Sequence, residues 1–143
     1  MRVMLLGATG LVGGEVLNLA LADPKVQQVV APTRRALPAH AKLLNPMVNF
    51  DALPADAEWW AVDAVVCALG TTIKKAGSQA AFYQVDHDYP LRVAELALRH
   101  GAKAYALNSV LGADPDSRVF YSRTKGELER DLKALGYASL SLV

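Results

Sequence analysis

The sequence predicts an α/β protein with a doubly wound parallel sheet, built as a single domain of three α/β/α layers. Short apolar runs alternate with segments of helical periodicity along the whole chain, as a parallel sheet with crossover helices requires. A glycine-rich stretch separates the first apolar run from the first helical segment. The length of 143 residues, 52% of them hydrophobic, supports one core. We therefore expect one domain over residues 1–143.

Composition excludes several classes of protein. Charged residues make up 20% of the chain and the formal net charge is +1, which argues against a disordered chain and against a basic nucleic-acid binder. Cys67 is the only cysteine, and the three histidines lack metal-ligand spacing. Glycines interrupt the N-terminal apolar run, and no stretch reaches about 18 apolar residues. We expect a cytoplasmic protein with no metal, nucleic-acid or membrane partner.

The first half of the chain predicts three strands and one helix. Residues 3–6 form the first strand, and the helix after the glycines ends at Asp23, because Pro24 disfavours helix in the residue before it. Residues 26–31 form the second strand, which a proline-bearing polar loop closes. The pattern of residues 47–50 predicts the third strand.

The second half predicts three more strands and two helices. The apolar run 64–69 reads as a strand buried on both faces near the centre of the sheet. A helix capped by Asp88 ends at Gly101, the fifth strand covers 104–107, and the sixth begins at residue 138. Between them lies a last helix with leucines at i, i+4 and i+7, at Leu128, Leu132 and Leu135. The predicted strand order is 3-2-1-4-5-6.

The glycine-rich stretch predicts a dinucleotide site. Gly7, Gly10 and Gly13 lie between the first strand and the first helix. Glycines there permit a tight turn, close approach of the backbone to a pyrophosphate, and tight packing of helix on strand. A glycine-rich turn without a ligand is the alternative, but the strand before and the helix after favour binding. The cofactor-binding residues predicted in this turn are Gly7, Thr9, Gly10, Leu11, Val12 and Gly13.

Two arginines at the end of the second strand predict the choice of cofactor. NAD-selective sites place a carboxylate about 20 residues after the glycines, where it accepts hydrogen bonds from the ribose hydroxyls. This chain has Arg34 and Arg35 at that place. A guanidinium cannot accept those bonds, but it suits a 2′-phosphate, so we expect NADP(H) to be preferred over NAD(H). The alternative is that the arginines only solubilise a surface loop.

Three further residues converge on the same edge of the predicted sheet. Tyr121 and Lys125 lie four residues apart, on one face of the last helix. Ser109 follows the fifth strand, at the carboxyl edge where parallel α/β folds bind ligands. A tyrosine and lysine at this spacing occur often by chance, so the position of all three residues carries the prediction.

In these residues the chain resembles the short-chain dehydrogenase/reductase superfamily, in its extended or atypical branch. The resemblance rests on the glycine spacing, on Ser109, and on Tyr121 with Lys125. The stretch from Leu69 to Tyr89 is similar to the Tat-interacting-protein-like oxidoreductases of that branch.

The resemblance implies a role for each of these positions. Tyr121 would be the general acid, Lys125 would favour ionisation of its phenol and hold the nicotinamide ribose, and Ser109 would hydrogen-bond the substrate carbonyl. Where the family commonly has an asparagine of a proton relay, this chain has Asp86. Asp51 would approach the adenine, with a helix cap as the alternative. Three residues would lie along the cofactor, namely Leu69, Gly70 and Thr71.

The expected function is NADP(H)-dependent reduction of a small-molecule carbonyl, or oxidation of the alcohol. Two alternatives stay open: a non-catalytic NADP(H)-binding module for redox sensing or protein interaction, and a semialdehyde-dehydrogenase-like NADP-binding domain, for which Cys67 is the only thiol. A homodimer through the outer helices is also open. Because the chain ends at Val143, inside the sixth strand, we expect a domain that lacks the C-terminal substrate-binding segment.

Overall fold

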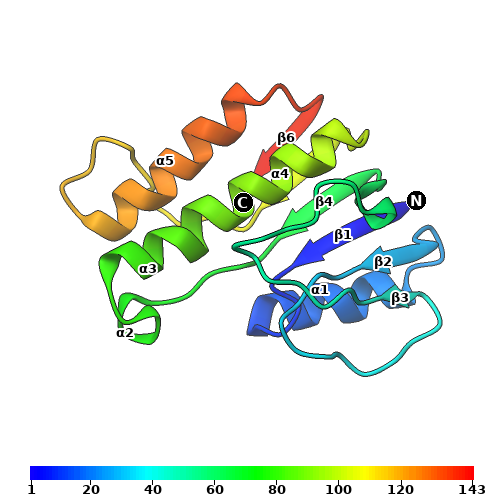
Figure 1. Ribbon diagram of the computed structural model, residues 1–143. Coiled ribbons are helices and arrows are strands. Elements are labelled where there is room, and N and C mark those ends of the chain that lie inside the picture. The colour runs from blue at the N-terminus through cyan, green and yellow to red at the C-terminus, as the bar shows by residue number, and fades with distance from the viewer.

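The computed structural model describes residues 1–143 and contains one parallel sheet of six strands with helices on both faces (Figure 1). The strand order is β3-β2-β1-β4-β5-β6, which confirms the predicted fold class and order. The strands are β1 (Arg2–Leu6), β2 (Gln28–Val30), β3 (Leu43–Leu44), β4 (Ala64–Cys67), β5 (Ala104–Leu107) and β6 (Ser139–Leu142). The helices are α1 (Leu11–Ala22), the 3₁₀ turn η1 (Glu58–Trp60), α2 (Ile73–Ala76), α3 (Gln79–Tyr83), the π-helical turn η2 (Gln84–Asp88), α4 (Tyr89–Arg99) and α5 (Phe120–Ala134).

Two hydrophobic cores lie on opposite faces of the sheet. Alternate residues of β1 supply both, because successive side chains of a strand point to opposite faces: Met4 belongs to one core and Leu5 to the other. The larger core packs under α4 and α5, and the smaller one packs under α1. Figure 1 shows α4 and α5 on one side of the sheet and α1 on the other. No helix combines the length and apolar character needed to cross a membrane.

Strand β4 lies near the centre of the sheet as predicted, but its two faces are not equally buried. Val65 and Cys67 are fully buried in the larger core. Ala64 and Val66 point to the other face and are only half-buried. Val66 packs at the margin of the smaller core under α1. The prediction of burial on both faces is therefore right for one face and wrong for the other.

The third strand does not lie at residues 47–50, as predicted, but at Leu43–Leu44. The ladder beside β2 continues past it only as an isolated bridge between Thr33 and Met47. Pro46 has no N–H to donate, and the Asn45 side chain donates instead to the Ala31 carbonyl at 2.6 Å. The strand therefore stops short of that proline, and the chain leaves the sheet after the Met47 bridge.

The helix before β5 begins earlier than predicted. Ser78 caps α3 by accepting a hydrogen bond from the Ala81 N–H at 3.1 Å. The chain then runs through the π-helical turn η2 directly into α4. Asp88 is therefore not the cap, and its carboxylate bonds the His87 ring instead. Pro90 lies in the first turn of α4, as expected, and the helix ends before Gly101.

Candidate functional site

The turn after β1 requires glycine at two positions. Gly7 has a φ of 82°, and a Cβ there would lie 2.5 Å from the Ala68 carbonyl group. Gly13 is buried in the first turn of α1, and a Cβ there would lie 1.8 Å from the Gly7 oxygen. Gly10, the N-cap residue of α1, donates its N–H to the Gly7 oxygen at 3.0 Å. The backbone is therefore folded tightly on itself at the carboxyl end of β1.

The N-terminus of α1 offers free backbone donors at this turn. The first N–H groups of a helix have no intrahelical partner and carry partial positive charge. In α1 no side chain caps them either. The side chains of Leu11 and Val12 are exposed and line none of the cavities described below. Any contact these two residues make with an anion would come from the backbone.

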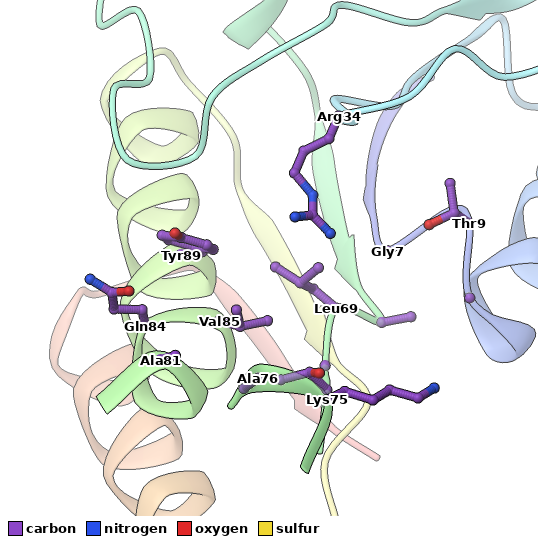
Figure 2. A pocket seen from close by; sticks show the side chains of 14 residues that line it. Gly7, Thr9, Arg34, Leu69, Lys75, Ala76, Ala81, Gln84, Val85 and Tyr89 are labelled. Atoms are coloured by element: carbon purple, nitrogen blue, oxygen red, sulfur yellow. The ribbon is translucent and has the colours of Figure 1, made fainter. Parts of the chain in front are cut away.

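A cavity of about 380 Å³ opens in front of this turn, and we call it the glycine cavity. It brings together predicted cofactor-binding residues from three loops, those after β1, β2 and β4. Figure 2 shows the Arg34 side chain extending into it between Tyr89 and Thr9. Arg35 lies outside it, in a separate cavity of about 310 Å³ that Thr9 and Arg34 also line. The glycine cavity is lined by Gly7, Thr9, Gly10, Arg34, Ala68, Leu69, Gly70, Thr71, Lys75, Ala76, Ala81, Gln84, Val85 and Tyr89.

Next to Arg34 lies a smaller cavity of about 250 Å³, the Asp51 cavity. The Tyr89 hydroxyl donates to Asp51 Oδ1 at 2.8 Å, and the Tyr89 ring stacks on Phe50 with 5.4 Å between centroids. Burial, followed by the Asp51 hydrogen bond, raises the pKa of Tyr89. No helix begins at Asp51, so the alternative role as a helix cap is wrong. The sequence reasoning did not identify Phe50 and Tyr89 as site residues.

The predicted catalytic residues meet in a third cavity of about 320 Å³, the Tyr121 cavity, which Ser109, Tyr121 and Lys125 all line. Tyr121 stands in the first turn of α5 and is 38% exposed. The Lys125 ammonium lies 5.8 Å from the centroid of the Tyr121 ring. Asp86, from η2, lines the same cavity.

Lys125 forms a buried ion pair with Asp86. The second carboxylate oxygen of Asp86 accepts a hydrogen bond from the Thr71 N–H at 3.1 Å. Burial raises the pKa of the Asp86 carboxyl, while the neighbouring Lys125 ammonium and the Thr71 N–H work against that rise. The carboxylate therefore connects α5, η2 and the loop after β4.

Ser109 has an acidic partner that the sequence reasoning did not identify. Its hydroxyl donates to Glu129 Oε2 at 2.5 Å, and Glu129 lies on α5, one turn after Lys125. Ser109 also lines a further cavity of about 480 Å³, with Leu111 and Leu142 among its apolar lining. The Ser109 side chain thus stands at the boundary between the Tyr121 cavity and this outer space.

The glycine, Asp51 and Tyr121 cavities adjoin one another along the carboxyl edge of the sheet, and we call the three together the groove. The glycine and Tyr121 cavities share five lining residues from β4 onward, namely Ala68, Leu69, Gly70, Thr71 and Lys75. The Asp51 cavity shares Arg34, Leu69, Val85 and Tyr89 with the glycine cavity. The groove therefore runs from Asp51, past the glycine turn, to Tyr121.

Cys67 does not reach this groove. Its side chain is fully buried in β4, and burial raises the pKa of its thiol, which disfavours the nucleophilic thiolate. This counts against the semialdehyde-dehydrogenase-like alternative. No group of three or more His, Cys, Asp or Glu side chains is arranged to hold a metal ion.

Comparison with known proteins finds similar sequences but no matching family model. The mitochondrial protein fmp52 of Emericella nidulans is 37% identical over 144 residues, which cover 95% of this chain and 62% of that protein. The mitochondrial protein FMP52 of Saccharomyces cerevisiae is 35% identical over 151 residues, which cover 100% of this chain and 64% of that protein. The chain thus spans less than two thirds of the length of these relatives.

These relatives correct one prediction. The sequence suggested a cytoplasmic protein, but the relatives that match most of the chain are named mitochondrial proteins. The cytoplasmic prediction is therefore wrong. It rested on one reduced cysteine and on the lack of a long apolar segment, and both features are equally compatible with other compartments.

Solved structures share the fold. MoeE5 in complex with UDP-glucose and NAD superposes with a TM-score of 0.79 at 19% identity, covering 99% of this chain and 52% of that one. A UDP-glucuronic acid 4-epimerase from Bacillus cereus in complex with NAD gives 0.78 at 10% identity, covering 99% and 55%. A putative NAD-dependent epimerase/dehydratase from Bacillus halodurans gives 0.76 at 22% identity, covering 99% and 68%. At these identities the likeness shows the fold alone, a Rossmann-like fold of the NAD(P)-binding type.

Proposed function

We propose that residues 1–143 form the NADP(H)-binding domain of an oxidoreductase that reduces a small-molecule carbonyl or oxidises the corresponding alcohol. The observation that carries the proposal is the pair of adjoining cavities, because together they are lined by the glycine turn and by Tyr121 and Lys125. The similar solved structures contain NAD, which supports dinucleotide binding by this fold.

The residues along the groove fit such a cofactor. Gly13 packs so closely on the Gly7 oxygen that no side chain fits there. The free N–H groups at the start of α1 are therefore not covered by a side chain at this position, and such groups suit a pyrophosphate. The stacked pair Phe50 and Tyr89 offers an aromatic surface for an adenine. Arg34 lies between that pair and the glycine turn, where a ribose 2′-phosphate would meet it.

Tyr121, Lys125 and Ser109 then have separate roles in the reaction. The bound nicotinamide supplies the hydride. Tyr121 delivers a proton from its hydroxyl to the carbonyl oxygen, and takes it back in the reverse reaction. Lys125 lies one turn away, with its ammonium 5.8 Å from the centroid of the Tyr121 ring, and would hold the nicotinamide ribose. Ser109 orients the carbonyl by donating its hydroxyl hydrogen, which requires the Oγ to leave Glu129.

The experiment that tests the cofactor assignment is titration of this chain with NADPH and with NADH, followed by the fluorescence of the reduced nicotinamide. We expect saturable binding of both, with the tighter binding for NADPH. If neither dinucleotide shows saturable binding, the proposed function is wrong. If NADH binds more tightly than NADPH, only the preference for NADP(H) is wrong.

The variant Arg34→Ala tests the source of that preference. We expect it to weaken NADPH binding by about 1.5 to 3 kcal/mol, the worth of a hydrogen bond to a charged group, and to leave NADH binding nearly unchanged. Arg92→Ala is the matched control, because Arg92 is exposed on α4, away from the groove. Calorimetry that shows equal losses for both dinucleotides in Arg34→Ala contradicts the assignment of Arg34 to the 2′-phosphate.

A further inference from the structure

The ion pair between Asp86 and Lys125 is almost completely withdrawn from solvent. The exposed fractions of the two residues are 1% and 6%. A buried ion pair adds little net stability compared with apolar side chains of similar size, because both charges lose their hydration. Stability alone therefore does not explain why these two charges meet beneath the Tyr121 cavity.

Asp86 is fixed from two directions besides Lys125. Its Oδ2 accepts from the Thr71 N–H in the loop after β4. A Cβ added to Gly70 would lie 3.3 Å from Asp86 Oδ1 and 3.8 Å from the Lys125 ammonium, so the backbone of that loop packs directly on the pair. The carboxylate cannot move without disturbing the loop that separates the glycine and Tyr121 cavities.

The π-helical turn η2 fixes the carboxylate from the helix side. Asp86 and His87 are consecutive in it, and both are buried. The His87 ring bonds Asp131 of α5 through Nε2 at 2.7 Å, and Asp88 through Nδ1 at 2.8 Å. The turn is thus tied to α5 twice, once through each buried residue. Turns of this type occur frequently at functional sites.

An ammonium has three N–H donors, and Asp86 is the only hydrogen-bond acceptor of Lys125 in the structure. Two donors are left for the cavity that the ammonium lines. We propose that Asp86 is a positioning residue, which holds the Lys125 ammonium so that its two remaining donors meet the hydroxyls of a nicotinamide ribose. This inference rests on the proposed function, since it requires a dinucleotide in the groove.

The test compares two ligands that share only one end. NADPH reaches from Arg34 to Lys125, whereas adenosine 2′,5′-bisphosphate carries the 2′-phosphate but no nicotinamide ribose. In Asp86→Asn we expect calorimetry to show about tenfold weaker NADPH binding, as for loss of one charged hydrogen bond, and unchanged binding of the bisphosphate. Asp88→Asn, which changes the half-exposed neighbouring carboxylate, is the control and should bind both ligands normally.

A second variant separates positioning from folding. Asp86→Asn leaves a buried ammonium without its counter-charge, whereas Asp86→Asn/Lys125→Met leaves no buried charge and should regain thermal stability. We expect this double variant to bind NADPH as weakly as Lys125→Met alone, because Asp86 acts through Lys125. Weaker binding by the double variant than by Lys125→Met overturns the inference.

The remaining outcomes are equally decisive. Unchanged NADPH binding in Asp86→Asn, or equal losses for NADPH and the bisphosphate in a folded variant, also overturns the positioning role. If the unaltered chain binds the bisphosphate but shows no gain for NADPH, the positioning role fails while the Arg34 end of the proposed function stands. If it binds neither ligand, both fail.

Discussion

Gly13→Ala is expected to destabilise the protein by about 3 kcal/mol or more and to abolish NADPH binding. The added methyl would lie 1.8 Å from the Gly7 oxygen, far inside van der Waals contact. That oxygen belongs to the backbone, so it cannot rotate away as the end of a flexible side chain could. Relief requires α1 to move away from the end of β1, which opens the turn that would hold the pyrophosphate. Chemical denaturation and the NADPH titration measure the two effects.

Gly14→Ala is the matched control for this prediction. Its Cβ would lie 3.7 Å from the nearest atom, the Ala8 oxygen, which is an ordinary contact. Since glycine in a helix costs roughly 0.5 to 1 kcal/mol relative to alanine, this neighbour should gain that much stability and keep its NADPH binding. A stable Gly13→Ala protein that still binds NADPH contradicts the account of the turn.

Tyr121→Phe is expected to lower carbonyl reduction by roughly 10² to 10⁴-fold, the usual contribution of a general acid, and to leave NADPH binding unchanged. The phenylalanine keeps the ring beside Lys125 and Phe82 and removes only the hydroxyl. Turnover is followed in a chain extended to the length of the relatives, as loss of NADPH absorbance with benzaldehyde as the carbonyl probe.

Tyr83→Phe controls for loss of a phenol elsewhere. The Tyr83 hydroxyl donates to Glu127 at 2.8 Å and lines none of the three cavities, so this variant should turn over normally. Undiminished turnover in Tyr121→Phe would remove the tyrosine from the mechanism. If a chain extended to the length of the relatives binds NADPH but reduces no carbonyl, the non-catalytic binding module becomes the better description.

The sheet could be predicted from the sequence because its strands differ from their surroundings. The runs that became β1 and β4 are apolar and bounded by glycine or charge, so their place and order followed from parallel α/β topology. Strand β3 could not be found in this way, since two leucines make no pattern. Residues 47–50 are mostly apolar, like a short strand, but Pro46 interrupts the ladder just before them and only Met47 forms a bridge.

In the candidate site, too, local sequence patterns predicted some residues and missed others. Gly7, Arg34 and Tyr121 could be placed because each follows a strand or begins a helix at the carboxyl edge of the sheet. The contacts of Asp86 with Lys125 and of Tyr89 with Asp51 join residues 39 and 38 positions apart. They depend on how η2 turns its residues and on the path of the loop after β3, which local patterns do not encode.

That loop has an evolutionary consequence. The glycine end of the groove is built from strand ends and a helix start, whereas Phe50 and Asp51 come from the long connection between β3 and η1. Insertions or exchanges in this connection would alter the Asp51 cavity while leaving the Tyr121 cavity unchanged. Under the proposed function, such a layout would let the same sheet edge be adapted to different cofactors by changing a single loop.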